Sequence, residues 1–203
     1  MGKTMSPSNT ITRGQAGKLA DMCVAQLIKS TLQSEQTQEV LERHGAVLAD
    51  AFVELVRARV EVLCSTIVRH SIVNRTRSGH EALKATGRAL YCNDGVVKTM
   101  PNGIGEEVEV HFFKIGKYVN DTTADEEYAL RGLIPADPYA LAAINEADPA
   151  FADEHPNCTH WKDKGGKWCC AAFLRWLDDV RYVSVNQGVS GWCGHWWFAG
   201  VRK

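Results

Sequence analysis

The stretch WCCAAFLRWLDDVRYVSV, residues 168–185, is the part of the sequence that most clearly decides the fold. Aromatic and β-branched side chains fill two runs on either side of an Asp-Asp pair at 178–179, which is typical of two strands joined by a tight turn. A turn at this pair places Leu174 opposite Val183 on the neighbouring strand. We therefore predict a β-hairpin, with large apolar side chains on at least one of its faces.

Strand-like patterns continue on both sides of this hairpin. One begins at Thr159, and another, HWWFAGV, covers 195–201. Together they predict a small Trp-rich antiparallel meander of three or four strands over 159–203. Upstream, 106–115 alternates like a strand, and 137–147 is typical of a helix that begins with Pro after an aspartate N-cap.

All six tryptophans of the chain lie in this C-terminal region, at position 161 or later. A small sheet needs large side chains to form a core, and each Trp can bury about 150–250 Å². We expect most of them to be structural. The alternative is an aromatic platform that stacks on bases or sugars. Its residues would be Trp192, Trp196, Trp197 and Arg181.

The N-terminal part of the chain has helical periodicity. Residues 1–10 have the composition of a disordered lead-in, and Thr12 is a candidate N-cap. Gly45 is expected to end a short helix, and an apolar stripe at steps of three and four then runs from Leu48 to about Val68. We predict an α+β protein, with a helical hairpin or three-helix lobe over 11–70 and an α+β domain over 71–203. The stripe is suited to packing within the chain or to self-association.

Two Cys-x-His pairs are the candidate metal site, because residues i and i+2 of a strand share one face. They are Cys158 with His160 and Cys193 with His195. Together they would form a Cys₂His₂ zinc site, although the spacing departs from that of structural zinc sites. The same residues could serve a thiol-dependent enzyme, or the cysteines could pack as small apolar side chains. The sequence contains no nucleophile elbow, P-loop or dinucleotide fingerprint, so a protein without enzymatic activity or cofactor is favoured.

A basic stretch over 69–88 is the candidate anion or nucleic-acid site, with one acid among five Arg and Lys residues. The residues proposed to contact phosphates are Arg75, Arg77, Lys84 and Arg88. The competing interpretation is that they pair with the acidic segment 106–154 of the same chain, which holds twelve of the 24 acidic residues. We favour the second interpretation, because the formal net charge is −1 and a dedicated nucleic-acid domain is usually basic overall.

Composition favours an ordinary globular protein, with 45 % hydrophobic and 23 % charged residues. The first fifteen residues lack the apolar segment of a secretion signal, and no apolar run approaches the roughly 20 residues that span a bilayer. We therefore expect a cytoplasmic protein that does not enter the membrane, with its seven cysteines reduced.

Three segments carry a resemblance to a family of uncharacterised bacterial proteins of similar length. They are ADPYALAAINEADPAFADEHPNCTHWKD (136–163), GKWCCAAFLRW (166–176) and WWFAGVRK (196–203). The similarity runs from about Val73 to the end of the sequence. It implies a bacterial or phage origin and carries no activity or site residue. With the patterns above, we expect a non-enzymatic binding or assembly module whose partner is another protein or a second copy.

Overall fold

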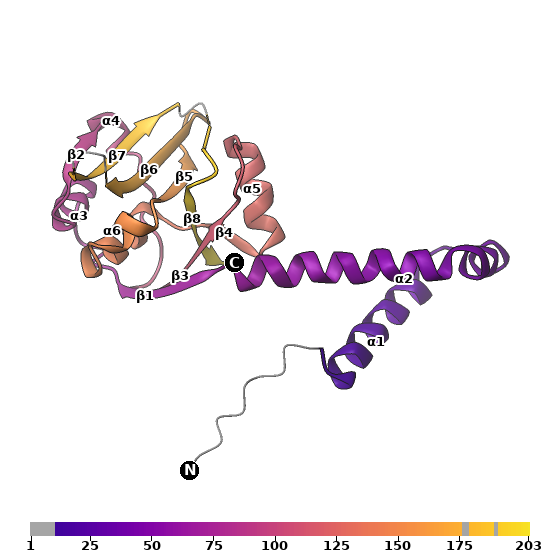
Figure 1. Cartoon of the computed structure of the whole chain (residues 1–203). Helices are drawn as coiled ribbons and strands as arrows, with labels where there is room; N and C mark the ends of the chain where they lie inside the picture. The colour runs from indigo at the N-terminus through magenta and orange to yellow at the C-terminus, as the bar shows by residue number, and fades with distance from the viewer. Residues whose placement is uncertain (1–10, 176–178, 189–190) are drawn as a thin grey trace, which may run out of the picture. The chain divides into compact units, whose positions relative to one another are not determined.

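A computed structural model describes residues 11–175, 179–188 and 191–203 (Figure 1). The chain divides into two compact units, Met1–Arg57 and Ala58–Lys203. The helices are α1 (Arg13–Lys29), α2 (Ser34–Cys64), α3 (Gly79–Ala85), α4 (Asp94–Val97), α5 (Asp121–Leu130), α6 (Pro138–Ala147) and α7 (Phe151–Glu154). The strands are β1 (Ile67–Ile72), β2 (Ala89–Cys92), β3 (Glu107–Lys114), β4 (Leu133–Pro135), β5 (Asn157–Lys162), β6 (Trp168–Arg175), β7 (Arg181–Gln187) and β8 (Trp197–Arg202).

Helix α1 begins where the sequence predicts. The Thr12 hydroxyl accepts a hydrogen bond from the backbone N–H of Gln15 at 3.2 Å. The Gln15 side chain accepts one in return from the backbone N–H of Thr12 at 2.8 Å. This capping box satisfies two backbone donors that the first turn of a helix leaves without partners, which confirms Thr12 as the N-cap.

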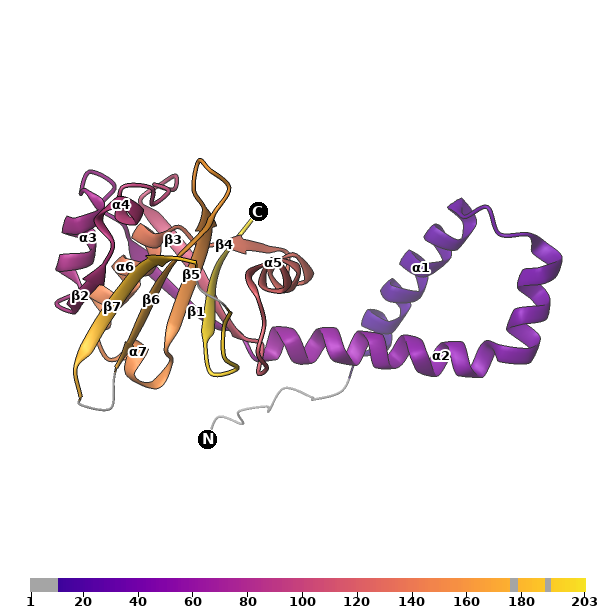
Figure 2. The ribbon, with the colours of Figure 1, turned by 90° about the horizontal axis from the view of Figure 1, so that it is seen from above.

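Helix α2 differs from the prediction at both places where the sequence suggested a boundary. It runs without interruption through Gly45, because one glycine costs a helix about 1 kcal/mol relative to Ala but keeps both backbone hydrogen-bonding groups. The helix changes direction part-way along its length (Figure 2). At its other end, α2 stops at Cys64, and Ile67 and Val68 belong to β1 instead. β-Branched residues favour a strand, and a short apolar run does not distinguish the two structures.

The strands form one mixed sheet in the order β1-β3-β8-β5-β6-β7-β2, with β4 also pairing with β8. The antiparallel pairs β5–β6 and β6–β7 agree with the predicted hairpins. The prediction of a small antiparallel meander is wrong, because β8 pairs in parallel with β5 and β2 pairs in parallel with β7. After β7 the chain does not turn back into a hairpin. Instead, Trp192 bridges to Val119, and β8 enters the sheet between β3 and β5.

The middle of the sheet is buried on both faces, and strand β6 shows this most clearly. Ala171 and Phe173 belong to a core with side chains from α3, α4, α6 and α7, whereas Cys170 and Ala172 belong to a second core with side chains from α5. Helices therefore cover both faces of the sheet (Figure 1). A strand buried on both faces has a nearly continuous apolar sequence, which is what 168–174 shows.

The register of the central hairpin differs from the prediction by one residue. Leu174 lies opposite Tyr182, and Val183 lies opposite Phe173. A shift of one residue exchanges the faces on which side chains lie, and a strand with one solvent-facing side would reveal it in the sequence. Here both faces are apolar, so the pattern of β6 fits either register equally well.

Two glycine-to-alanine substitutions test the backbone of each unit. No atom lies within 4 Å of a Cβ added at Gly45 or Gly87, but Gly87 has a φ of 69°. We expect Gly45→Ala to stabilise α2 by about 1 kcal/mol, and Gly87→Ala to destabilise the α+β unit by about 1–2 kcal/mol. Far-UV circular dichroism reports the first change. Tryptophan fluorescence reports the second, since every Trp lies after residue 160. A loss of helix stability in the Gly45 variant would contradict the continuous helix.

Candidate functional site

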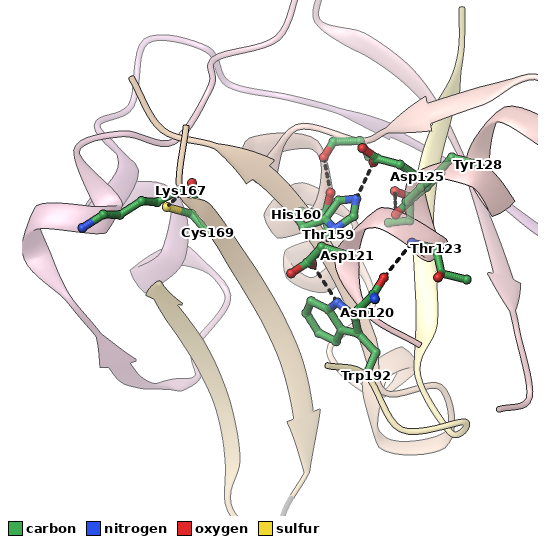
Figure 3. A network of polar contacts seen from close by, with 12 residues as sticks. Asn120, Asp121, Thr123, Asp125, Tyr128, Thr159, His160, Lys167, Cys169 and Trp192 are labelled. Atoms are coloured by element: carbon green, nitrogen blue, oxygen red, sulfur yellow. Dashed lines mark hydrogen bonds and ion pairs between the residues drawn. The ribbon is translucent and has the colours of Figure 1, made fainter. Parts of the chain in front are cut away.

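A buried polar network joins α5, β5 and the loop that precedes β8 (Figure 3). The Nδ1 atom of His160 lies 2.8 Å from Oδ1 of Asp121, and its Nε2 atom lies 2.9 Å from Oδ1 of Asp125. The indole N–H of Trp192 donates to the same Asp121 oxygen at 2.9 Å. Oδ1 of Asp121 thus contacts both His160 and Trp192, which belong to different parts of the sequence.

Local structure explains why these groups meet. The Asn120 side chain accepts a hydrogen bond from the backbone N–H of Thr123 at 2.8 Å and caps α5. Asp121 and Asp125 are four residues apart on that helix, so both project from one side of it. On β5, residues Cys158 and His160 share one face because side chains alternate along a strand. That face carries the core built with α5.

Both ring nitrogens of His160 are engaged in the network. Each nitrogen of an imidazole can form one hydrogen bond, and here each lies within hydrogen-bond distance of a carboxylate oxygen. Its side chain is 1 % exposed, and it stacks on the Trp168 ring with centroids 4.7 Å apart. The histidine is therefore a buried ring held between two acids, with both of its nitrogens occupied.

Exposure differs between the two acids, which sets their importance for stability. The side chain of Asp121 is 7 % exposed and that of Asp125 is 44 % exposed. We expect Asp121→Ala to reduce the free energy of unfolding by about 3 kcal/mol, since it leaves two buried polar groups, Nδ1 of His160 and the indole N–H of Trp192, without their shared partner. Asp125→Ala should cost about 1 kcal/mol, because water can replace a half-exposed partner. Urea unfolding followed by tryptophan fluorescence measures both, and equal losses would show that burial does not govern the network.

The thiols beside this network are not nucleophiles at neutral pH. Burial raises the pKa of Cys158 well above its usual range and raises the pKa of Cys170 to about 12. Burial likewise raises the pKa of Cys169. The reactive form of cysteine is the thiolate, so these side chains remain protonated and behave as small apolar groups.

The raised pKa of Cys170 predicts a loss of stability in alkali. Between about pH 9, where an unfolded chain releases this proton, and about pH 12, where the folded chain does, the folded state binds more protons. The free energy of unfolding should therefore fall as pH rises through this window, by up to about 1.4 kcal/mol per pH unit from this thiol. We expect a shallower pH dependence in Cys170→Ala, measured by urea unfolding at each pH. The matched control is Cys193→Ala, which replaces an exposed cysteine and should leave the slope unchanged.

The four residues of the candidate zinc site lie in different environments. Cys158 and His160 are buried beside α5, and both nitrogens of His160 already contact carboxylates. Cys193 and His195 are exposed in the loop before β8. Within the described residues, no group of three or more His, Cys, Asp or Glu side chains is arranged to hold a metal ion.

The candidate phosphate-binding residues mostly have partners inside the chain. Arg75 contacts Asp137 at 2.5 Å, and Arg77 contacts Glu146 at 2.6 Å. Both acids belong to the acidic segment, which is the pairing that the charge pattern favoured. Arg88 is buried, and its guanidinium donates to the backbone carbonyls of Leu174 and Pro149 at 3.0 and 2.8 Å. Lys84 is exposed on α3.

The residues of the candidate aromatic platform do not form one exposed surface. Trp192 is 1 % exposed and packs edge-on against Trp196, which is half-buried. Trp197 is half-buried and contacts the ring of His155 with centroids 5.1 Å apart. Arg181, on β7, makes paired hydrogen bonds to the carboxylate of Asp153.

Asp121 and Asp125 were not among the candidates from the sequence. Their signal is weak, since it consists of two acids at helical spacing directly after an asparagine N-cap. That pattern is equally typical of a solvated first turn, where acids are favoured by the helix dipole. Their contact with His160, 39 and 35 residues away, depends on the packing of α5 against the sheet.

A second candidate surface lies on the N-terminal helices. None of residues 11–57 is buried, and Leu19, Cys23 and Val56 are the half-buried apolar side chains among them. The described chain has 22 exposed large hydrophobic side chains, and thirteen of them lie in this segment. Val60, further along α2, is another. None of the helices in the described ranges is both long and apolar enough to cross a membrane.

No protein-family model matches the chain, and neither a curated protein nor a solved structure is significantly similar to it. Two features of the chain bear on its function: the polar network beside α5 and the exposed apolar side chains of α1 and α2. The polar network holds α5 to the sheet, and its member Asp125 reaches the surface. The helical surface is open.

Proposed function

We propose that this protein is a non-enzymatic assembly module that associates through α1 and α2 and carries the α+β unit as a folded domain. The observation that carries the proposal is the complete lack of buried side chains among residues 11–57. Helices in proteins owe most of their stability to the burial of an apolar face. Two helices with apolar side chains and no buried face are what an association surface looks like before its partner binds.

The magnitude of the effect supports association. Complete burial of a Leu, Val or Phe side chain contributes about 1.5–3 kcal/mol. The exposed apolar residues on α2 are 38–67 % exposed, so completing the burial of all eight would contribute about 6–12 kcal/mol, more than the roughly 5 kcal/mol at the lower end of the stability range of small proteins. The residues available on α2 are Val40, Leu41, Val47, Leu48, Phe52, Val53, Leu55 and Val60.

The chemistry of the α+β unit also favours a module without catalysis. Its buried histidine is held between two acids, and its buried thiols are protonated at neutral pH. General acid–base or nucleophilic catalysis requires such groups to reach a substrate. Here they face α5 and the interior of the sheet. Arg75 and Arg77, which a nucleic-acid binder would use, are paired with acids instead.

Analytical ultracentrifugation of the purified chain tests this function. We expect a mass above the 22.4 kDa of one chain at micromolar concentration. The double variant Leu48→Glu/Leu55→Glu should sediment as a single chain, since charges on the apolar face cannot be buried without partners. Ile104→Glu is the matched control, because Ile104 is 99 % exposed in the other unit. The proposal fails if the wild type has the mass of one chain at every concentration while its helices are formed.

A further inference from the structure

Three leucines of α2 are spaced seven residues apart. Leu41, Leu48 and Leu55 are 54, 49 and 57 % exposed. A seven-residue apolar repeat forms a stripe along one side of a helix and is typical of a helix that supercoils with another. On this numbering the leucines occupy position a of the heptad.

We propose that the surface that covers this stripe is a second copy of the same chain, aligned in parallel and in register as a two-stranded coiled coil. The inference rests on the proposed function, and it names the partner and its orientation. A parallel dimer in register brings each leucine against its own equivalent. Ala51, at position d between two leucines, has a small side chain that allows the two helices to approach.

Charge complementarity favours this partner. In a parallel two-stranded coiled coil, a residue at position g lies beside the residue five places further on in the second helix, at position e. Glu54 is at g and Arg59 is at e, and both are exposed. Each copy would therefore supply the acid for one ion pair and the base for the other. At the preceding pair of positions, Val47 (g) of one helix lies beside Phe52 (e) of the other, and both are apolar.

The antiparallel alternative lacks this match. Antiparallel coiled coils bring e positions against e positions and g positions against g positions. Along α2 the e positions are Gln38, Gly45, Phe52 and Arg59. None of them is an acid, so Arg59 would have no partner of opposite charge. Glu54 would face another g position, which is Val40, Val47 or an acid.

Exchange of the paired charges provides a test. Glu54→Arg alone places two arginines together at each pair, and Arg59→Glu alone places two glutamates together. Each variant should dissociate at a concentration about tenfold higher than the wild type, since two favourable contacts become repulsive. An equimolar mixture of the two variants should recover wild-type affinity as a heterodimer, because opposite charges face each other again. Sedimentation equilibrium measures the affinities, and native mass spectrometry counts the heterodimer.

The control must separate this contact from one within the helix. Glu54 also contacts Arg57 of its own α2. Arg57→Glu removes that contact at position c, which faces away from the second helix, and should leave the dimer affinity unchanged. A loss equal to that of Glu54→Arg would overturn the assignment of Glu54 to the interface.

A cross-link tests the orientation independently. His44 lies at position d, so His44→Cys in a parallel dimer places two thiols opposite each other. Mild oxidation should yield a covalent dimer on a non-reducing gel beyond that of the wild type treated alike. If a dimer forms but shows no extra cross-link and no recovery in the mixture, the parallel coiled coil is wrong and the assembly function stands. If the wild type has the mass of a single chain, both proposals fail.

Discussion

The contact between Asp121 and His160 is the interaction on which the architecture of the α+β unit depends. It attaches α5 to β5, and the same carboxylate oxygen holds Trp192 in the loop before β8. Without α5, the second face of the sheet would expose Phe113, Cys158 and Phe198 to water. A buried polar contact costs free energy to form, and removing one partner leaves the other unsatisfied. The network therefore selects one position for α5 more than it adds stability.

The two units differ in where their polar and apolar side chains find contacts. In the α+β unit, apolar side chains build two buried cores, and charged groups form pairs such as Arg75–Asp137 and Arg77–Glu146. In residues 11–57, polar contacts are local and apolar groups remain exposed. The two units therefore differ in burial: the α+β unit has two buried cores, and residues 11–57 have none.

The parts of the fold that depend on local interactions were predictable from the sequence. The caps at Thr12 and Asp137 follow from side chains that bind backbone groups three residues away. The antiparallel pairing of β6 with β7 follows from two neighbouring apolar runs, whereas Asp178 of the predicted turn lies outside the described residues. The parallel pairs β5–β8 and β2–β7 could not be predicted, because they join segments about 40 and 90 residues apart and leave no local pattern. The contact of His160 with α5 was missed for the same reason, whereas the charge pattern did predict that the basic stretch pairs within the chain.

The position of β8 has a consequence for synthesis. It follows every other strand in the sequence, yet it lies inside the sheet with β3, β5 and β4 as neighbours. Pairings of such large sequence separation are slow to form, and unpaired strands are prone to aggregation. Strands β3 and β5 cannot pair with β8 until the ribosome has released residues 197–202. Helices α1 and α2 precede every strand in the sequence, so the surface that we propose for association is made before residues 197–202.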